Sequence, residues 1–412
     1  MQVLYERCCG LDVHKKTVVA CVVITALDGQ VHKQVRTFAT TTASLLALTD
    51  WLASFPISHI ALESTGIYWR PVFNLLEEGR TIILVNAQHM RAVPGRKTDV
   101  KDSEWLADLL RHGLLKASFI PAKPTRDLRD LVRYRKSLVQ DRTQEINRLQ
   151  KVLETANVKL SSVVSDVLGK SGRRMLAAII NGVSDAEALA DLARGTLRHK
   201  LPQLQQALEG RIEAHHRVLL QQTFAHIAFL EDSIQQLQQE IDQRLSPFAE
   251  AMLLLLSIPG IQAITAAAIL AEIGTQMERF PSAKHLASWA GVCPGNKQSG
   301  GKRLSGKTTK GNARLRSALV EVVWNISRIK DNYLSAQYHR LARRMKKQQA
   351  AMAVAHSLLV IIYHVLSDKQ PYRELGADYF DHVDKERQTL QALRRLEALG
   401  YTVTLTPKEE VA

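Results

Sequence analysis

The apolar and polar residues of the chain alternate in short runs at first and take on helical spacing later. Residues 8–14 are short and apolar, residues 17–27 are β-branched and apolar, and residues 31–39 alternate. The pair Asp28-Gly29 lies between the second and third runs, where Asp-Gly is a strong hairpin signal. We therefore expect three antiparallel strands at the start of the chain.

Helical and strand patterns then alternate. Residues 41–55 and 68–79 have helical apolar spacing, whereas residues 59–65 and 81–86 are short apolar runs typical of buried strands. Three antiparallel strands followed by this alternation predict a mixed sheet of the ribonuclease H type. The expected fold class is α/β for the first part of the chain and α for the rest.

Two long helices are expected after residue 120. The first covers residues 125–157 and the second residues 212–245. The second carries a near-heptad apolar stripe, formed by Ile227, Leu230, Ile234, Leu237, Ile241 and Leu245. The two helices could form an antiparallel coiled-coil arm, a dimer seam or part of an ordinary bundle, and the sequence leaves this open.

Residues 253–274 place a Pro-Gly turn between two apolar helices, which is similar to a helix-hairpin-helix element. Backbone N–H groups at such a turn can hold a phosphate. Gln262 stands where the second glycine of that element is usual, so a purely structural hairpin is an equal alternative. Helical patterns return at residues 313–327 and 348–366, and the last forty residues are charged and helical.

Charge and composition narrow the class of partner. The 412 residues carry a formal net charge of +15. This charge favours a protein that binds a polyanion such as nucleic acid, and the alternative is a basic housekeeping protein without such a partner. The four cysteines lack the spacing of a zinc site, and we expect them to be small buried apolar residues. So few cysteines in a chain of this length indicate a protein of a reducing compartment. No signal peptide or membrane-spanning run is recognised, so we expect a cytoplasmic protein without a membrane partner.

Four carboxylates are placed for metal chemistry. Asp12 lies in the first strand, Glu63 ends the fourth, and Asp99 and Asp102 open the helix after the last strand, three residues apart on one helical face. An Asp in a central strand is costly to bury unless a cation accompanies it. Mg²⁺ would relieve the repulsion, and paired ions of this kind promote phosphoryl transfer.

Each acid also has an ordinary alternative role. Asp99 could be only a helix cap, Asp102 a partner of the helix dipole and Glu63 a surface acid at a strand end. Their joint placement favours the metal site. Glu104 and Asp108 are rotated away from the face shared by the helical pair.

Six segments resemble the DEDD transposases of the insertion sequence 110 family. GLDVHKK (10–16), ALESTGIYW (61–69) and GRKTDVKDSEWLADLLRHG (95–113) are similar to the RuvC-like part of that family, whereas SIPGIQAITAAAILAEIG (257–274), ASWAGVCPGNKQSGG (287–301) and GKTTKGNARLRSAL (306–319) are similar to its C-terminal transposase domain. With this resemblance, four regions are expected: a RuvC-like DEDD catalytic domain (1–120), a helical coiled-coil linker for oligomerisation (121–250), a transposase domain with a serine nucleophile (251–370) and a charged helical tail (371–412). No family motif covers the tail.

The family resemblance implies that a serine attacks DNA and forms a transient phosphoserine, and motif alignment places this serine at Ser299. Glycines beside it would let the backbone approach a phosphate closely. Ser305 is the rival nucleophile, and a flexible DNA-binding loop is the alternative without catalysis. No histidine lies near Ser299 in sequence, so the expected activators are the metal and its carboxylates in the other domain.

Basic residues near these motifs are the expected nucleic-acid contacts. In the order of the chain they are Arg96, Lys97, Lys101, Arg133, Arg135, Lys136, Lys297, Lys302, Arg303, Lys307, Lys310 and Arg314, joined by the backbone of Gly300 and Gly301. The basic run at residues 126–142 is a candidate RNA contact or, alternatively, a solvated helix face.

The family further implies target DNA, donor DNA and a structured guide (bridge) RNA as partners, and a homo-oligomer, either a dimer or a tetramer. Two other functions are considered. A RuvC-like Holliday junction nuclease would use the carboxylates and water and would not need Ser299. A non-enzymatic architectural protein would bind DNA through the helix-hairpin-helix element and the basic loop.

Overall fold

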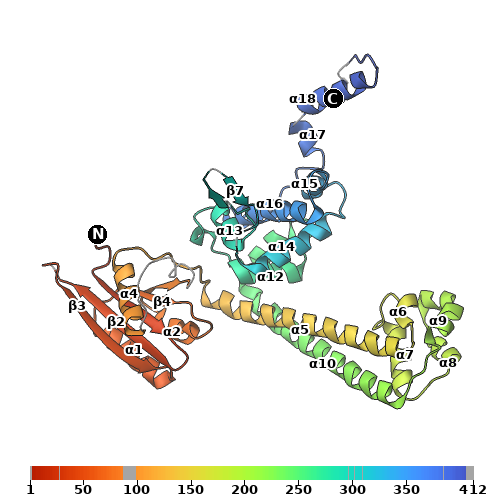
Figure 1. The fold of residues 1–412 in the computed structure, drawn as a ribbon, viewed down its shortest axis with the longest axis horizontal. Helices are drawn as coiled ribbons and strands as arrows, with labels where there is room; N and C mark the ends of the chain where they lie inside the picture. Colours follow the sequence, from red (N-terminus) through yellow and green to blue (C-terminus); the bar gives the residue numbers. More distant parts are fainter. Residues whose placement is uncertain are drawn as a thin grey trace. The chain divides into compact units, whose positions relative to one another are not determined.

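A computed structural model of the chain describes residues 2–26, 28–86, 99–295, 297–300, 302–308, 310–383 and 385–404. The chain divides into two compact units, Met1–Ile120 and Pro121–Ala412 (Figure 1). The first holds a five-stranded sheet and the second is almost entirely helical. The expected succession of an α/β region and an α region is confirmed.

The sheet of the first unit has the spatial order β3-β2-β1-β4-β5. Its strands are β1 (Arg7–Val13), β2 (Thr17–Thr25), β3 (Val31–Ala39), β4 (His59–Glu63) and β5 (Thr81–Val85). β2 pairs antiparallel with β1 and with β3, whereas β4 pairs parallel with β1 and with β5. The three antiparallel strands and the following helix-strand alternation therefore form as predicted, and β1 lies at the centre.

Helices cover both faces of this sheet. Helices α1 (Thr42–Ala53) and α2 (Trp69–Leu76) bury their leucines against one face, together with Leu11 and Leu62. Helix α4 (Asp99–Arg111) packs on the other face against Cys8 and Ala61. Burial raises the pKa of the Cys8 thiol to about 12, which fits the predicted role of a small apolar residue.

Two long helices form an arm in the second unit. Helix α5 (Lys123–Thr155) and helix α10 (Ala214–Arg244) run antiparallel and side by side (Figure 1). Ile227 packs in one cluster with Leu149, and Ile241 packs in another with Leu128. At Ile227 and Ile241 the near-heptad stripe of α10 is thus buried against a helix of the same chain, whereas Ile234 and Leu237 are half-buried.

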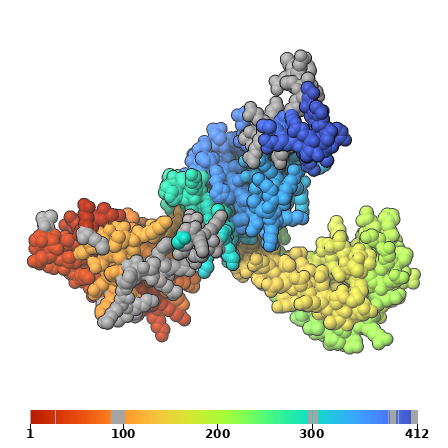
Figure 2. Space-filling view, turned by 45° about the horizontal axis from the view of Figure 1, so that its top comes forward, coloured from red at the N-terminus to blue at the C-terminus, as the bar shows by residue number. Residues whose placement is uncertain are grey.

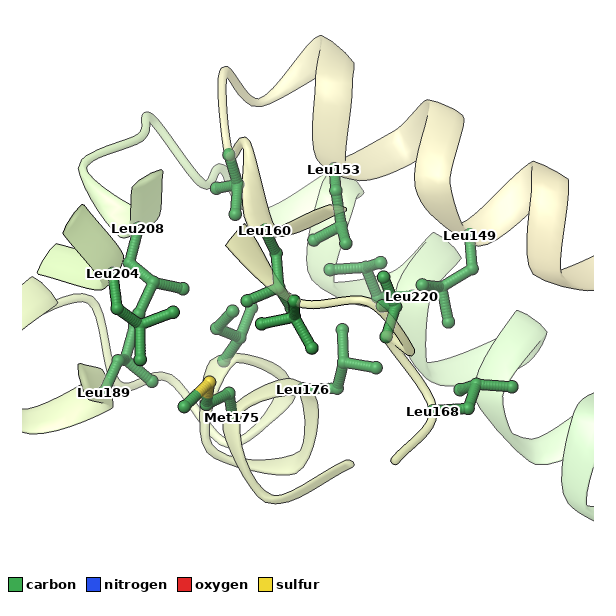
Figure 3. Close-up of a cluster of buried hydrophobic side chains, with 14 of the residues drawn as sticks. Leu149, Leu153, Leu160, Leu168, Met175, Leu176, Leu189, Leu204, Leu208 and Leu220 are labelled. Carbon is green, nitrogen blue, oxygen red and sulfur yellow. The ribbon is translucent and has the colours of Figure 1, made fainter. Parts of the chain in front are cut away.

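Four short helices close the far end of the arm, where they gather into a lobe (Figure 2). They are α6 (Leu160–Val163), α7 (Lys170–Ile180), α8 (Ala186–Ala190) and α9 (Leu201–Leu208), with a 3₁₀ turn η1 at Gly195–Lys200. Figure 3 shows Leu153 of α5, Leu176 of α7 and Leu220 of α10 pointing into their common core. The lobe is therefore fastened to both helices of the arm.

The remaining helices lie between residues 246 and 398. They are α11 (Ala249–Leu256), α12 (Ala263–Ile273), α13 (Ala283–Ala290), α14 (Ala313–Ile326), α15 (Tyr333–Ala342), α16 (Lys347–Ser367), α17 (Tyr379–Val383) and α18 (Lys385–Ala398), with 3₁₀ turns η2 (Ser246–Phe248) and η3 (Met277–Arg279). Within the described ranges α16 is the one helix long and apolar enough to cross a membrane. Its best window is 50% buried, as expected of a core helix.

The Pro-Gly turn between α11 and α12 packs against protein. Gly260 has a φ of +83°, and a Cβ added there would lie 2.4 Å from Cγ1 of Ile326 in α14. Glycine is needed for both the backbone conformation and this contact. The packing favours the structural alternative for the hairpin over a phosphate-binding turn.

Candidate functional site

Asp12 and Glu63 lie on neighbouring strands. The parallel register of β1 and β4 runs as far as Leu11 and Leu62, and Asp12 and Glu63 are the next residues on these two strands. Leu11 and Leu62 point toward α1 and α2. Because side chains alternate along a strand, the two acids project from the opposite face, which α4 covers. The sheet thus brings together two carboxylates that are 51 positions apart by their numbers.

Helix α4 lies unusually close to β1. A Cβ added at Gly10 would lie 2.2 Å from the carbonyl oxygen of Ser103 and 2.5 Å from the amide nitrogen of Ala107. One step earlier on the same face, Cys8 Sγ lies 3.5 Å from the carbonyl oxygen of Ala107. Moving from Cys8 to Gly10 therefore moves about one turn toward the start of α4. The next residue on this face, Asp12, is directed toward the first turn of that helix.

The first turn of α4 carries the other predicted acids. Asp99 begins the helix, and Asp102 is half-buried one turn into it. The side chain of Asp99 lies outside the described residues, as do Arg96 and Lys97. Lys101 is exposed beside the acidic pair.

The donor chemistry of the predicted acidic residues suits a hard divalent cation. Asp12 is only 5% exposed, and its Oδ2 lies 3.0 Å from Nε2 of His14. Burying a carboxylate is unfavourable unless positive charge or hydrogen bonds compensate. Asp12, Glu63 and Asp102 supply carboxylate oxygens from three elements, and oxygen donors are those that Mg²⁺ prefers.

Ser299 lies near the tip of a small hairpin in the second unit. Strand β6 (Lys297–Ser299) pairs antiparallel with β7 (Lys302–Ser305), and Ser299 pairs with Lys302. Gly300 follows with a φ of +55° in the tight turn. Ser305 lies at the opposite end of the hairpin, paired with Lys297. The two candidate nucleophiles thus occupy different positions, one at the tip and one at the base.

The other predicted contacts of the hairpin are placed unequally. Lys307, Lys310 and Arg314 are exposed beyond β7. For Lys297, Lys302 and Arg303 the structure describes the strand backbone, and Gly301 lies outside the described residues.

The three basic residues predicted on the arm are less available than the sequence indicated. Arg133 is fixed by Glu272 of α12, to which its Nε and Nη2 donate at 2.8 and 2.7 Å. Arg135 and Lys136 are half-buried on α5, and burial lowers the pKa of Arg135. Arg133 therefore has a structural contact that the sequence analysis did not anticipate.

Glu272 is the main residue that the sequence analysis missed. It is 4% exposed, and besides Arg133 it contacts Asn312, whose side-chain nitrogen donates to its Oε2 at 2.6 Å. Burial raises the pKa of Glu272, but the hydrogen bonds from Arg133 and Asn312 outweigh it and the net pKa is lowered. A single acid in an otherwise apolar helix was the available signal.

A second group of metal-binding residue types lies at the start of α10. The ligand atoms of Glu213, His215 and His216 lie within 4.8 Å of one another. Nδ1 of His216 accepts a hydrogen bond from the backbone N–H of Glu213 at 3.2 Å. The Nδ1 lone pair of His216 is thus occupied by this capping hydrogen bond at the helix N-terminus and is not available to a metal ion. Capping therefore explains why this histidine is buried.

Two family models match the chain. One, for the DEDD transposases of IS110 and described as a transposase, matches residues 9–158. The other, described as the transposase IS116/IS110/IS902 family, matches residues 252–339. Together the matches span more than half of the chain and include both the acidic site and the serine hairpin.

Individual relatives agree with these matches. The transposase for insertion sequence element IS1328 of Yersinia enterocolitica is 23% identical over 74% of this chain and 80% of its own length. The transposase for IS1111A of Coxiella burnetii is 22% identical over 78% of this chain and 81% of its own. The pilin gene-inverting protein of Moraxella bovis is 34% identical over 34% of this chain and 45% of its own.

Proposed function

This chain belongs to the IS110 family of transposases and is a DNA recombinase, and from that premise we propose that Ser299 forms a transient covalent link to a DNA strand. The observation that carries the proposal is the position of Ser299 near the tip of a hairpin whose strands and following segment carry basic residues. Ser305, at the base of the hairpin, is not the proposed nucleophile.

In the proposed step, the Ser299 hydroxyl oxygen attacks the phosphorus of a phosphodiester. The Oγ–P bond forms while the bond from phosphorus to the leaving sugar oxygen breaks. The hydroxyl proton passes to a general base, and the leaving oxygen takes up a proton. Because the phosphoserine keeps the energy of the ester bond, a sugar hydroxyl of another strand can attack it and release the serine.

The hairpin is suited to bind the phosphate that reacts. Exposed Lys307 and Lys310 supply positive charge, and Lys302 and Arg303 lie on the strand that pairs with β6. Positive charge placed where negative charge develops stabilises the transition state. Gly300 has a left-handed backbone conformation, and no heavy atom lies within 4 Å of a Cβ added there. The protein backbone at this turn is therefore open to close approach by a DNA phosphate.

Membership of a DEDD family implies use of a divalent metal ion. We assign the binding of Mg²⁺ to Asp12, Glu63, Asp99 and Asp102, with His14 orienting the carboxylate of Asp12. When bound, the ion would stabilise charge on the attacking and leaving oxygens. The buried position of Asp12 would hold its carboxylate in one orientation.

The proposal includes a bridge RNA that pairs with target and donor DNA, so that the protein contacts the backbone and base pairing selects the sequence. Residues 1–120 would be the RuvC-like domain, residues 121–250 the coiled-coil and oligomerisation region, residues 251–370 the transposase domain and residues 371–412 a tail. A homo-oligomer in the bacterial cytoplasm would join the strands. Family membership and the formal net charge of +15 support these assignments.

The experiment supplies purified protein with the noncoding RNA of its element and with an RNA whose pairing loops are changed. We expect recombination to move to the newly matched DNA site while the protein is unchanged. Protein freed of RNA should bind DNA with little sequence preference. Site-specific recombination by RNA-free protein would contradict the guided function, and a junction nuclease would not be redirected by the RNA.

A further inference from the structure

Glu272 joins three helices through one buried carboxylate. Its oxygens accept two hydrogen bonds from Arg133 of α5 and one from Asn312, which precedes α14. Arg129, one turn before Arg133, donates from Nε to the carbonyl of Ala271 at 2.8 Å and from Nη2 to the carbonyl of Glu272 at 2.7 Å. The end of α12 is therefore held against α5 by both side-chain and backbone contacts.

Asn312 carries this connection to the root of the serine hairpin. Its Oδ1 accepts from the backbone N–H groups of Arg314 and Leu315, each at 3.1 Å, and thereby caps α14. Its own backbone N–H donates to the carbonyl of Trp289 at 3.2 Å, in the last turn of α13, the helix that precedes the hairpin. Asn312, which Glu272 contacts, therefore lies between the end of the hairpin segment and the start of α14.

The segments that enter and leave the hairpin touch closely at this root. A Cβ added at Gly311 would lie 2.3 Å from the amide nitrogen of Gly291. Further up, the N–H of Gly295 donates to the carbonyl of Lys307 at 2.9 Å, and Pro294 is bridged to Thr308. A small rotation at the root would therefore move the whole hairpin, including its tip.

We propose that Glu272 is a positioning residue that fixes the root of the serine hairpin to helix α5 and thereby orients the nucleophile. This inference rests on the proposed attack by Ser299. A hydrophobic contact could stabilise the same packing, because replacing a buried ion pair with well-packed apolar residues is often neutral for stability. Hydrogen bonds from two donors to one carboxylate are directional, so they define the orientation of Asn312 as well as its distance.

The position of the network links the hairpin to the arm. Helix α5 continues from Arg133 to the lobe at the far end, where Leu149 and Leu153 enter the core. A partner that moves α5 would also move Arg133 and would thereby change the position of Glu272 relative to Asn312. The network is therefore suited to relate the state of the arm to the orientation of Ser299.

A reciprocal exchange of hydrogen-bond polarity tests this role. Glu272→Gln places an amide group opposite the amide of Asn312, and Asn312→Asp places a carboxylate opposite Glu272, although it retains an oxygen to cap α14. In the double variant, the new amide at position 272 can donate to the new carboxylate at position 312, which restores the contact between these two positions. The amide oxygen still accepts from Nε of Arg133, whereas the hydrogen bond from Nη2 of Arg133 is lost. Glu250→Gln, on the exposed surface of α11, is the matched control.

The measurement is the single-turnover rate of strand cleavage at saturating protein, with the guide RNA and target DNA present and well below the melting temperature of each variant. We expect each single variant to slow cleavage by about 100-fold, the effect of a displacement of roughly 1 Å, and the double variant to recover part of that loss, since only the contact between positions 272 and 312 is restored. DNA affinity should stay within about threefold, because no phosphate contact is removed. If Glu272→Gln alone fails to fold, Asn312→Asp and the double variant carry the comparison.

Wild-type cleavage rates in both single variants, with only their melting temperatures lowered, would overturn the positioning role and leave a structural contact. Equal loss in the single and double variants would also overturn it. Ser299→Ala in the same assay separates the two proposals. A covalent adduct that persists in Ser299→Ala contradicts the serine assignment, whereas normal cleavage by Glu272→Gln with no adduct in Ser299→Ala contradicts only the role of Glu272.

Discussion

The acidic site and the serine hairpin are built in opposite ways. Asp12 is buried in the central strand of a sheet covered by helices on both faces, so strand register and the packing of α4 determine its position. Ser299 lies on a three-residue strand whose hairpin is anchored at its root. The first site is rigid by burial, whereas the second depends on residues outside the hairpin for its orientation. Substitutions should therefore affect the two sites differently.

Loss of the proposed nucleophile, Ser299, should have the largest effect. We expect Ser299→Ala to reduce strand cleavage by a factor of roughly 10⁴ or more, as for the loss of an enzyme nucleophile. DNA binding should remain, because the hydroxyl is a small contact among many basic groups. Ser305→Ala, at the base of the hairpin, is the control and should cleave at nearly the wild-type rate. The measurements are cleavage of labelled DNA and a binding isotherm, and greater loss in Ser305→Ala would exchange the two roles.

Substitutions at the acidic site should come next. Asp12→Asn and Glu63→Gln should each slow cleavage by about 10² to 10³-fold, the range for removing one strong electrostatic interaction with the transition state. Both metal-free proteins should be at least as stable as wild type, since repulsion between carboxylates is reduced.

Mg²⁺ should raise the melting temperature of wild-type protein and have much less effect on these variants. Glu104→Gln is the control. Glu104 lies on the same helix but forms an ion pair with Lys33, its Oε2 lying 3.5 Å from Nζ of Lys33, and it is not among the proposed ligands. Wild-type cleavage by Asp12→Asn would remove that residue from the site. Full activity in EDTA would contradict the metal assignment as a whole.

Gly10→Ala tests whether burial positions the acids. The new Cβ would overlap the backbone of α4 at Ser103, so the helix must shift. We expect a loss of about 1 to 3 kcal/mol in the free energy of unfolding, typical of overpacking. The stabilisation by Mg²⁺ should also fall, which thermal melting with and without the ion would measure. Cys8→Ala is the control on the same strand face, and an unchanged response to Mg²⁺ in Gly10→Ala would show that the acids do not depend on this packing.

Neutralising exposed charge beside the hairpin should have the smallest effect. Lys307→Gln with Lys310→Gln should lower the slope of log affinity against log salt by roughly 0.9 for each phosphate of duplex DNA that the variant no longer neutralises. The folded structure should be unaffected, since both side chains are exposed. Salt titrations of DNA binding provide the measurement. An unchanged slope would remove the two lysines from the interface.

Much of the first unit could be predicted from local patterns. The order of strands and helices follows from apolar periodicity, and the parallel pairing of β1 with β4 brings Asp12 beside Glu63. The contact of α4 with Gly10 could not be predicted in this way, because it depends on how closely a helix lies on a strand about ninety residues earlier in the chain.

The second unit shows the limit of local patterns more clearly. The near-heptad stripe of α10 predicts a partner helix but does not identify it, and the structure identifies α5 of the same chain. Glu272 was missed because its one sequence signal is that it is an acid in an apolar helix, and its partners Arg133 and Asn312 are distant in sequence. The choice of Ser299 over Ser305 came from the family motif, and their separation to opposite ends of the hairpin came from the structure.

The most direct test of the central claim is to identify the residue that becomes linked to DNA. The reaction with guide RNA and target DNA is stopped during turnover, the protein is digested, and peptides that carry a nucleotide are located by mass spectrometry. We predict that the nucleotide is attached to Ser299. Attachment to Ser305 or another residue, or active cleavage with no covalent adduct at any time, would contradict the account.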